Sequence, residues 1–292
     1  MIMKVLYLIL NYKTYQETIK LTDELLANGL TDSCVLIVDN ASPNESYKEL
    51  CTCYEKTENV EVIQSPENGG YAKGNNYGLR YAKKYVPEYV CIINNDVHFT
   101  KETIEQLCEW YEKLPHVALI APKQILPGGR EATFSSLETP TLRTDLSWYN
   151  PFTKKRHQYI ENTDIKGVNE AGIIPGAFLF TKYSVFESLG FFDESTFLFC
   201  EERFTAKKAE MAGLKNYIIL TETYLHDHST TIKKEASEKR QRKMILEGRL
   251  LYHKKYSNHP VLACGLLKTC YYLNELYLKT YSIARSAKHR IK

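Results

Sequence analysis

Residues 89–97 have the sequence YVCIINNDV, an apolar run that ends abruptly in polar residues. A short run without polar interruption is typical of a strand that helices cover on both faces, as in parallel sheets. Similar runs occur at residues 5–10, 34–38, 60–63 and 117–121. These runs predict an α/β fold with a mainly parallel central sheet flanked by helices.

The segments between these runs have helical spacing. Residues 15–27 are followed by an Asn-Gly pair at residues 28–29, and residues 100–113 begin with a capping threonine. Right-handed crossovers through such helices place all loops that follow the strands on one edge of the sheet, where open α/β folds bind ligands. We therefore expect the polar residues that begin at Asn11, Asp39 and Asn94 to converge there.

The second half of the chain is less regular. A strand and a helix are expected at residues 177–180 and 184–189, whereas residues 123–169 resemble a long loop or an inserted subregion. The sequence from residue 232 onward is helical and basic. The predicted organisation is a domain over residues 1–231, with halves of about 1–122 and 123–231, and a helical C-terminal extension over residues 232–292.

The composition is that of an ordinary globular protein. Of 292 residues, 43% are hydrophobic and 25% are charged, and the formal net charge of +3 gives no support to a nucleic-acid partner. The eight cysteines are scattered without the spacing of a zinc site, so we expect reduced thiols. Neither an export signal nor a run of about 18 apolar residues is found, which makes the cytoplasm the expected compartment.

Two common phosphate-binding motifs are missing. Asn11 and Tyr12 follow the first strand in place of the glycine-rich turn of a dinucleotide fold, and the Gly-Lys dipeptide of a P-loop does not occur. Residues 68–76, NGGYAKGNN, instead enter a helix with glycines and Lys73, a combination that can hold an anion. The alternative is a tight turn at the start of a helix.

Two carboxylates directly follow predicted strands. Asp96 can coordinate a hard divalent cation that is shared with a diphosphate, or it can be a turn residue. Asp39 can accept a hydrogen bond from a base or a ribose, or it can stabilise its own turn. Their shared edge of the sheet favours a functional interpretation of both.

These motifs together resemble, in order and spacing, those of family 2 glycosyltransferases with the GT-A fold. The resemblance extends from about residue 3 to residue 231 and includes bacterial rhamnosyltransferase-like enzymes of cell-surface polysaccharide assembly. The motifs are residues 38–42, 68–76 and 94–97 on the donor side and residues 175–179, 190–194 and 197–202 on the acceptor side.

The resemblance implies an inverting transfer of a sugar from a UDP-, dTDP- or GDP-linked donor to a hydroxyl of a glycan or lipid-linked acceptor, with Mg²⁺ or Mn²⁺ as cofactor. Asp96 is the implied metal ligand, although Asn94 replaces the first carboxylate of the usual triplet. His226 is a candidate residue of the donor site near the diphosphate or the metal, and His228 is a weaker candidate for the same role. The residues implied at the donor site are Asn11, Asp39, Asn68, Gly69, Tyr71, Asn75, Asn95 and His226.

The acidic pair Glu201-Glu202 occurs where the family usually has Glu-Asp. An inverting transfer needs a carboxylate on the acceptor side to remove the proton, so Glu202 is predicted as the base and Glu201 as a residue that orients the acceptor. The alternative is a surface pair that favours a helix dipole. Two rival functions are a catalytically inactive sugar-nucleotide-binding protein and a nucleotidyltransferase, although the glycine-rich N-terminal loop of the latter is missing.

The C-terminal extension combines basic residues with an apolar stripe. Leu266, Cys270, Leu273 and Tyr277 recur at spacings of four, three and four, which predicts an amphipathic helix. Basic residues beside such a face are typical of attachment to an anionic membrane surface. Packing against the catalytic domain, or against a second subunit in a homodimer, explains the same pattern.

Overall fold

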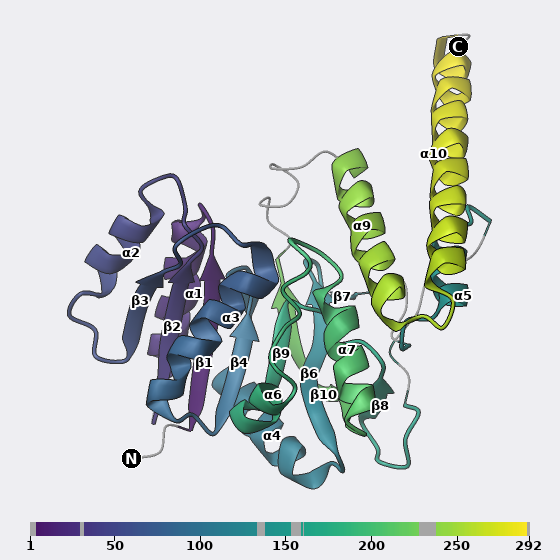
Figure 1. Cartoon of the computed structure of the whole chain (residues 1–292). Coiled ribbons are helices and arrows are strands. Elements are labelled where there is room, and N and C mark those ends of the chain that lie inside the picture. Colours follow the sequence, from purple (N-terminus) through teal and green to yellow (C-terminus); the bar gives the residue numbers. More distant parts are fainter. Residues whose placement is uncertain are drawn as a thin grey trace.

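A mixed sheet with helices on both faces forms the centre of the molecule (Figure 1). The structure is a computed structural model that describes residues 4–29, 32–132, 138–152, 159, 161–227 and 238–290, with side chains as far as residue 281. The strand order is β3-β2-β1-β4-β9-β6-β10-β5, with β7 added to β6 and β8 added to β10.

The first half of the sheet is parallel, as predicted. Its strands are β1 (Val5–Asn11), β2 (Ser33–Asp39), β3 (Val60–Gln64) and β4 (Tyr89–Ile93). β1 pairs in parallel with β2 and β4, and β2 pairs in parallel with β3. Asn11 is in register with Asp39, and Asp39 with Gln64, so the carboxyl ends of these strands meet at one edge.

The second half of the sheet is mixed. β9 (Phe178–Lys182) is antiparallel to β4 on one side and to β6 (Val117–Leu126) on the other. β10 (Lys215–His226) runs parallel to β6. The antiparallel strand β9 thus joins the two halves of the sheet. The short strands are β5 (Val97–His98), β7 (Arg130–Glu131) and β8 (Val168–Ala171).

Helices cover both faces of the sheet. Tyr7 and Ile9 of β1 belong to one hydrophobic core, and Leu6 and Leu8 belong to the core on the opposite face. Because β1 is buried on both faces, no polar residue interrupts it. The first core includes α1 (Tyr15–Ala27), α2 (Ser46–Tyr54) and α4 (Lys101–Lys113). The second core includes α3 (Gly70–Ala82), α6 (Tyr183–Ser188) and α7 (Glu201–Met211). The 3-10 helix η1 (Lys83–Tyr85) follows α3.

Residues 123–169 are more regular than predicted. β6 extends to Leu126, and α5 (Leu142–Trp148) begins with a capping box in which the Thr144 amide donates to the Thr141 hydroxyl at 3.1 Å. The expectation of a long loop is wrong for these parts, because a seven-residue helix is too short to show its periodicity. Residues 133–137, 153–158 and 160 lie outside the described part of the chain.

The C-terminal extension consists of α9 (Glu238–Tyr256) and α10 (Pro260–Arg290). A third hydrophobic core joins these two helices to α5 and contains Tyr149, Leu246 and Leu267. The far end of α10 projects beyond the rest of the molecule (Figure 1). The predicted boundary near residue 231 falls within residues 228–237, outside the described residues.

The predicted apolar stripe of α10 lies mostly on the exposed side of the helix. Leu267 and Tyr271 pack inward, whereas Leu266 and Leu273 are 40% and 61% exposed. Both sides of α10 are apolar, so residue spacing alone could not identify the side that packs. None of the helices in the described ranges is both long enough and apolar enough to cross a bilayer. The eight cysteines are free thiols.

Candidate active site

Buried hydrogen bonds connect the loops at the carboxyl edge of the parallel strands. Asp39 is fully buried, and its carboxylate accepts hydrogen bonds from Asn11 Nδ2 at 2.8 Å, Ser42 N at 2.9 Å and Gln64 Nε2 at 3.1 Å. These contacts stabilise the turn after β2. Contact of Asn11 or Asp39 with a nucleoside stays a prediction.

Gly70 brings the start of α3 against the loop before α7. Its φ is +81°, and a Cβ atom at this position would lie 1.9 Å from the carbonyl oxygen of Phe197. The amide of Tyr71 donates to that same oxygen at 2.9 Å. Only glycine fits so close an approach with this backbone conformation. Gly70 therefore joins the two halves of the domain at the predicted site.

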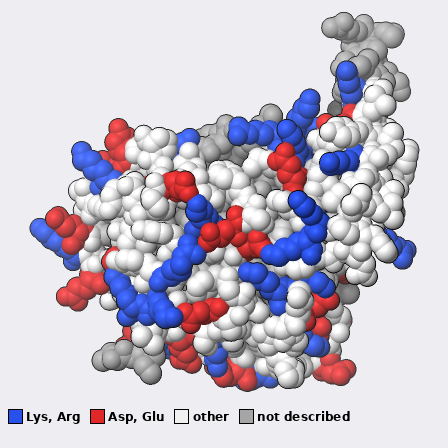
Figure 2. Space-filling view, viewed as in Figure 1, with Lys and Arg blue, Asp and Glu red and all other residues white. Residues whose placement is uncertain are grey.

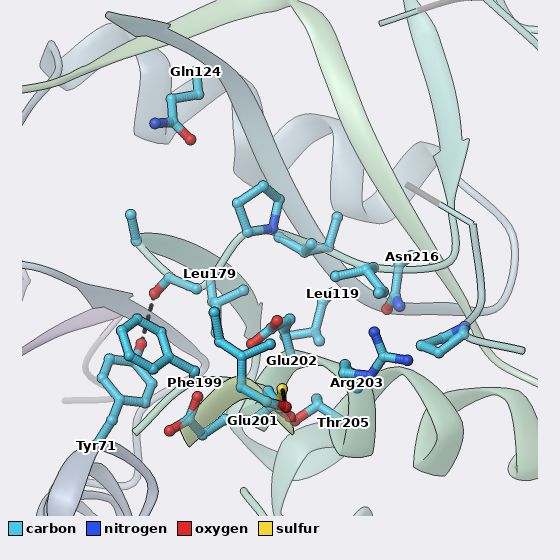
Figure 3. Close-up of a pocket in the computed structure, with 18 of the residues that line it drawn as sticks. Tyr71, Leu119, Gln124, Leu179, Phe199, Glu201, Glu202, Arg203, Thr205 and Asn216 are labelled. Carbon is cyan, nitrogen blue, oxygen red and sulfur yellow. Dashed lines mark hydrogen bonds between the residues drawn. The ribbon is translucent and has the colours of Figure 1, made fainter. Parts of the chain in front are cut away.

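Tyr71 is placed at the cavity by contacts with the second half. Its hydroxyl donates to the carbonyl oxygen of Gly176 at 2.6 Å, and its ring packs edge-on against Phe192 with the centroids 5.6 Å apart. Figure 3 shows the ring at one side of the cavity. Tyr71 can thus contact a bound substrate without changing its conformation.

Two other predicted residues of this segment hold its turn and helix. Asn68 Oδ1 accepts a hydrogen bond from Gly70 N at 3.1 Å. Asn75 is buried, and its Nδ2 donates to the carbonyl oxygen of Tyr71 at 2.9 Å. Both side chains therefore support the position of Tyr71.

The charge of Lys73 is compensated at the surface. Its ammonium forms an ion pair with Glu67, and a Cβ atom on Gly69 would lie 2.5 Å from its side chain. Gly69 is thus required for the path of Lys73 across the helix start. This arrangement corresponds to a helix start and does not place Lys73 as an anion ligand.

Asn94 and Asn95 point in different directions. Asn94 lines the cavity. Asn95 Nδ2 donates to the hydroxyls of Thr14 at 2.8 Å and Thr18 at 2.9 Å, so it connects the loop after β4 to the start of α1. The role of Asn95 in this structure is to position that loop.

Asp96 and His226 form a pair that fits a divalent cation. Asp96 Oδ1 lies 3.2 Å from His226 Nε2, and this buried oxygen has no hydrogen-bond partner among the described residues. Gln124 Nε2 lies 3.0 Å from His226 Nδ1 and orients the ring from the other side. A carboxylate oxygen beside an imidazole nitrogen suits Mn²⁺ or Mg²⁺. Within the described ranges, no group of three His, Cys, Asp or Glu residues forms a closed metal site.

The acidic pair opens α7. Cys200, with φ of +74°, precedes the helix and turns the chain into it. Glu201 is 5% exposed, and burial, followed by the charge of Glu202, raises its pKa to about 8. Burial also raises the pKa of Glu202. In Figure 3 the carboxylate of Glu202 points into the cavity, whereas Glu201 points toward the side of Tyr71.

One cavity of about 530 Å³ connects several of the predicted residues. Tyr71, Asn94 and His226 line it on one side, and Glu201 and Glu202 line it from α7. Asp96 is linked to it through His226. His228 lies outside the described residues. The predicted residues that do not line this cavity are Asn11, Asp39, Asn68, Gly69, Asn75, Asn95 and Asp96.

The sequence did not reveal a buried charged cluster in the cavity wall, which we call the Asp145 cluster. Asp145 on α5 is 2% exposed and lies 2.5 Å from Arg203 on α7, and 3.5 and 2.7 Å from Arg249 and His253 on α9. Burial alone would raise the pKa of Asp145, but the hydrogen bond from His253 and the charges of both arginines lower it below its usual value. The Asp145 cluster therefore joins the catalytic domain to the C-terminal extension.

A sequence profile of a known family matches more than half of the chain. The sequence profile described as glycosyl transferase family 2 matches residues 8–187. The chain belongs to glycosyl transferase family 2. This is the family that the motifs of the sequence resemble.

A relative of this family 2 glycosyltransferase is the low-salt glycan biosynthesis hexosyltransferase Agl10 of Haloferax volcanii. The two sequences are 27% identical over 196 residues. The matched region is 67% of this chain and 58% of Agl10, so the chain spans less than two thirds of that relative.

Solved structures confirm the GT-A fold of this family 2 glycosyltransferase. Staphylococcus aureus TarS 1-349, solved with UDP-GlcNAc, superimposes with a TM-score of 0.60 at 16% identity, over 91% of this chain and 70% of TarS. The mannosyltransferase PcManGT of Pyrobaculum calidifontis, solved with GDP-Man and Mn²⁺, gives a TM-score of 0.58 at 16% identity, over 99% and 76% of the two chains.

Proposed function

We propose that this glycosyltransferase moves a hexosyl group, with inversion, from a nucleotide diphosphate sugar to a hydroxyl of a glycan or lipid-linked acceptor. The observation that carries this proposal is that His226, paired with Asp96, and Glu202 line the same cavity. In an inverting transfer the acceptor oxygen attacks the anomeric carbon from the side opposite the departing diphosphate. Such a reaction needs a base on one side of the sugar and a stabiliser of negative charge on the other.

Glu202 is the proposed base. Its carboxylate points into the cavity and would take the proton of the acceptor hydroxyl as the new carbon–oxygen bond forms and the bond to the diphosphate breaks. Glu201, with a pKa of about 8, is mostly protonated at neutral pH and can donate a hydrogen bond that orients the acceptor. Burial raises the pKa of Glu202 as well, so the different directions of the two side chains, into the cavity for Glu202 and toward Tyr71 for Glu201, are what separates their proposed roles.

Asp96 and His226 would hold Mg²⁺ or Mn²⁺. Asp96 Oδ1 has no hydrogen-bond partner among the described residues, and it lies beside the His226 ring nitrogen. A bound divalent cation would supply charge stabilisation for the leaving diphosphate. The donor is a UDP-, dTDP- or GDP-linked sugar; UDP-GlcNAc and GDP-Man in the TarS and PcManGT structures support this class. Tyr71 and Asn94 would contact the transferred sugar, since both line the cavity.

We assign the enzyme to the assembly of cell-surface polysaccharide or lipopolysaccharide on the cytoplasmic side of the membrane. The relative Agl10, named as a hexosyltransferase of glycan biosynthesis, supports this assignment. A catalytically inactive sugar-nucleotide-binding protein would not need a carboxylate in the cavity, so Glu202 favours an active enzyme. A glycine-rich N-terminal loop, which a nucleotidyltransferase would use, is missing after β1.

Asp96→Ala is expected to lower the Mn²⁺-dependent affinity for the donor at least tenfold. The substitution removes the charged oxygen of the proposed metal pair but no part of the hydrophobic cores, so the apo melting temperature should change little. The affinity is measured as thermal stabilisation by UDP-, dTDP- and GDP-sugars, with and without Mn²⁺. Glu105→Ala, which removes an exposed carboxylate on α4, is the control. Equal Mn²⁺-dependent affinity in the two variants would contradict the assignment of Asp96.

The outer face of α10 supports attachment to a membrane. Leu262, Leu266, Leu273 and Leu276 follow one another at intervals of four, seven and three residues and are 40–61% exposed on one side of the helix. Figure 2 shows few charges along this helix. We call these four leucines the outer face of α10. An exposed apolar surface of this kind marks a binding site for another apolar surface.

The charge of this segment supports anionic lipid as the partner of this face. Residues 260–292 contain six basic residues and one acidic residue, Glu275, which pairs with Arg242 at 2.7 Å. Anionic headgroups would neutralise this excess of positive charge. A second copy of the chain would bring the same excess, with no free acidic residue on α10 within the described part to oppose it.

The full chain is expected to float with phosphatidylglycerol-containing vesicles at low salt, and the double variant Leu273→Glu/Leu276→Glu is expected to lose at least four fifths of this binding. The introduced charges oppose both insertion of the outer face and attraction to the headgroups. Met211→Glu, at an exposed apolar position on α7, is the control. Vesicle binding that is equal in all variants, or a wild-type dimer that the double variant converts to a monomer without any flotation, would reject the membrane as partner.

A further inference from the structure

Arg249 is a buried cation in the wall of the substrate cavity. It is 5% exposed and lines the cavity from α9. Its guanidinium carbon lies 4.6 Å from the ring centroid of Trp148 and 5.3 Å from that of Tyr149. The rings of Trp148, the last residue of α5, and Tyr149, which directly follows it, thus hold the guanidinium group in place.

Part of the hydrogen-bonding capacity of Arg249 is not used by the described residues. Its Nη1 and Nε are buried and have no hydrogen-bond partner among the described residues, although Nε lies 3.5 Å from Asp145 Oδ1. Arg203 Nε, in the same cluster, is also without a hydrogen-bond partner within the described part. Buried guanidinium donors without acceptors destabilise the folded state, so an acceptor from a ligand would be favoured there.

The charges of the Asp145 cluster do not balance. One carboxylate, Asp145, faces two guanidinium groups and the imidazole of His253. Three further carboxyls line the cavity: Glu138, which is exposed, Glu201, which is mostly protonated at neutral pH, and Glu202, which acts as the base only when it is deprotonated. Asp145 and the deprotonated Glu202 therefore both compensate the two guanidinium groups, and one positive charge becomes unmatched when Glu202 takes up a proton.

We propose that Arg249, assisted by Arg203, binds an oxyanion group of the glycosyl acceptor, a phosphate or a carboxylate. The planar guanidinium fork matches both groups, and the unused donors at the cavity wall would be satisfied by them. This inference rests on the proposed transfer to an acceptor hydroxyl. It makes the acceptor an anionic molecule, such as a sugar phosphate, a lipid phosphate or an acidic sugar.

The position of the arginines separates this site from the donor diphosphate. Gln124, the partner of His226, and Arg203 lie on opposite sides of Glu202 in Figure 3. In this view the proposed base lies between Gln124, at the donor end, and Arg203, which shares Asp145 with Arg249. An anion beside Arg249 would belong to the molecule whose hydroxyl Glu202 deprotonates.

The test is a titration with inorganic phosphate and with glucuronate, by isothermal calorimetry, with and without saturating UDP and Mn²⁺. We expect the wild type to bind one anion in both conditions, because UDP leaves the Arg249 site free. Arg249→Gln should weaken anion binding at least tenfold. Arg249→Lys, which keeps the charge but loses the fork, should weaken it less. Lys243→Gln, on the exposed side of α9, is the matched control and should leave binding unchanged.

The outcomes separate this inference from the proposed function. Failure of UDP, dTDP and GDP to bind would count against the donor assignment, while the titration without nucleotide still tests Arg249. Anion binding that UDP abolishes would place the anion at the donor end and overturn the inference. It is also overturned when neither anion binds the wild type, or when Arg249→Gln and Arg249→Lys bind as the wild type does. Arg249→Lys keeps the test valid if Arg249→Gln does not fold.

Discussion

Glu202→Gln is expected to lower kcat for sugar transfer by about 10²- to 10⁴-fold, the range typical of a lost general base. Glutamine has the same shape but cannot accept the proton of the acceptor hydroxyl. The donor binds at the other end of the cavity, near Asp96 and His226, so its affinity should change less than twofold. Steady-state transfer rates and donor affinity from calorimetry, measured on the same preparations, check both parts.

Glu201→Gln is the matched control for this prediction. Glu201 is mostly protonated at pH 7, because burial and then the charge of Glu202 raise its pKa to about 8. A glutamine therefore replaces a neutral group there, and we expect a loss of kcat of tenfold or less. If Glu201→Gln were the inactive variant and Glu202→Gln the active one, the roles of the two carboxyls would be exchanged.

The pH profile gives an independent measure of the base. A carboxylate base acts only when deprotonated, so kcat/KM should rise with pH through the pKa of Glu202, which burial raises above its usual value. The Glu201→Gln variant should keep this rise, because Glu202 is still present. Loss of the rise in that variant would show that Glu201 is the titrating base.

The parallel half of the fold could be predicted because its strands are buried on both faces. Tyr7 and Ile9 contact one core, and Leu6 and Leu8 contact the other. Residues 5–10 therefore form an uninterrupted apolar run that identifies the strand. The order of motifs predicted that Tyr71, Glu201 and Glu202 share one site, and the structure brings them to one cavity.

Other parts depend on contacts that the sequence does not show. Asp145 contacts Arg203 and His253, which are 58 and 108 residues away in the sequence. It lies on a helix of seven residues, which is too short to show a hydrophobic periodicity. The side of α10 that packs is decided by the shape of α5 and α9, since both sides of the helix are apolar. Local pattern alone could not identify these tertiary pairings.

Asp145→Ala is expected to lower the free energy of unfolding by about 3–5 kcal/mol, the usual cost of removing one partner from a buried ion pair. Arg203 and Arg249, 7% and 5% exposed, would lose the carboxylate that compensates them, while His253 would lose a hydrogen bond of 2.7 Å. Urea denaturation at pH 7 measures the change. Asp164→Ala, at an exposed position, is the control and should stay within about 0.5 kcal/mol of the wild type.

The pH dependence of this loss distinguishes charge from packing. The folded-state pKa of Asp145 is below its usual value, so its contribution to stability is complete above that usual value and disappears as pH falls through the folded pKa. The difference between wild type and Asp145→Ala should therefore be largest at pH 6–7 and shrink in acid. A difference that is the same at pH 7 and at pH 3 would mean that Asp145 acts through its volume and hydrogen bonds.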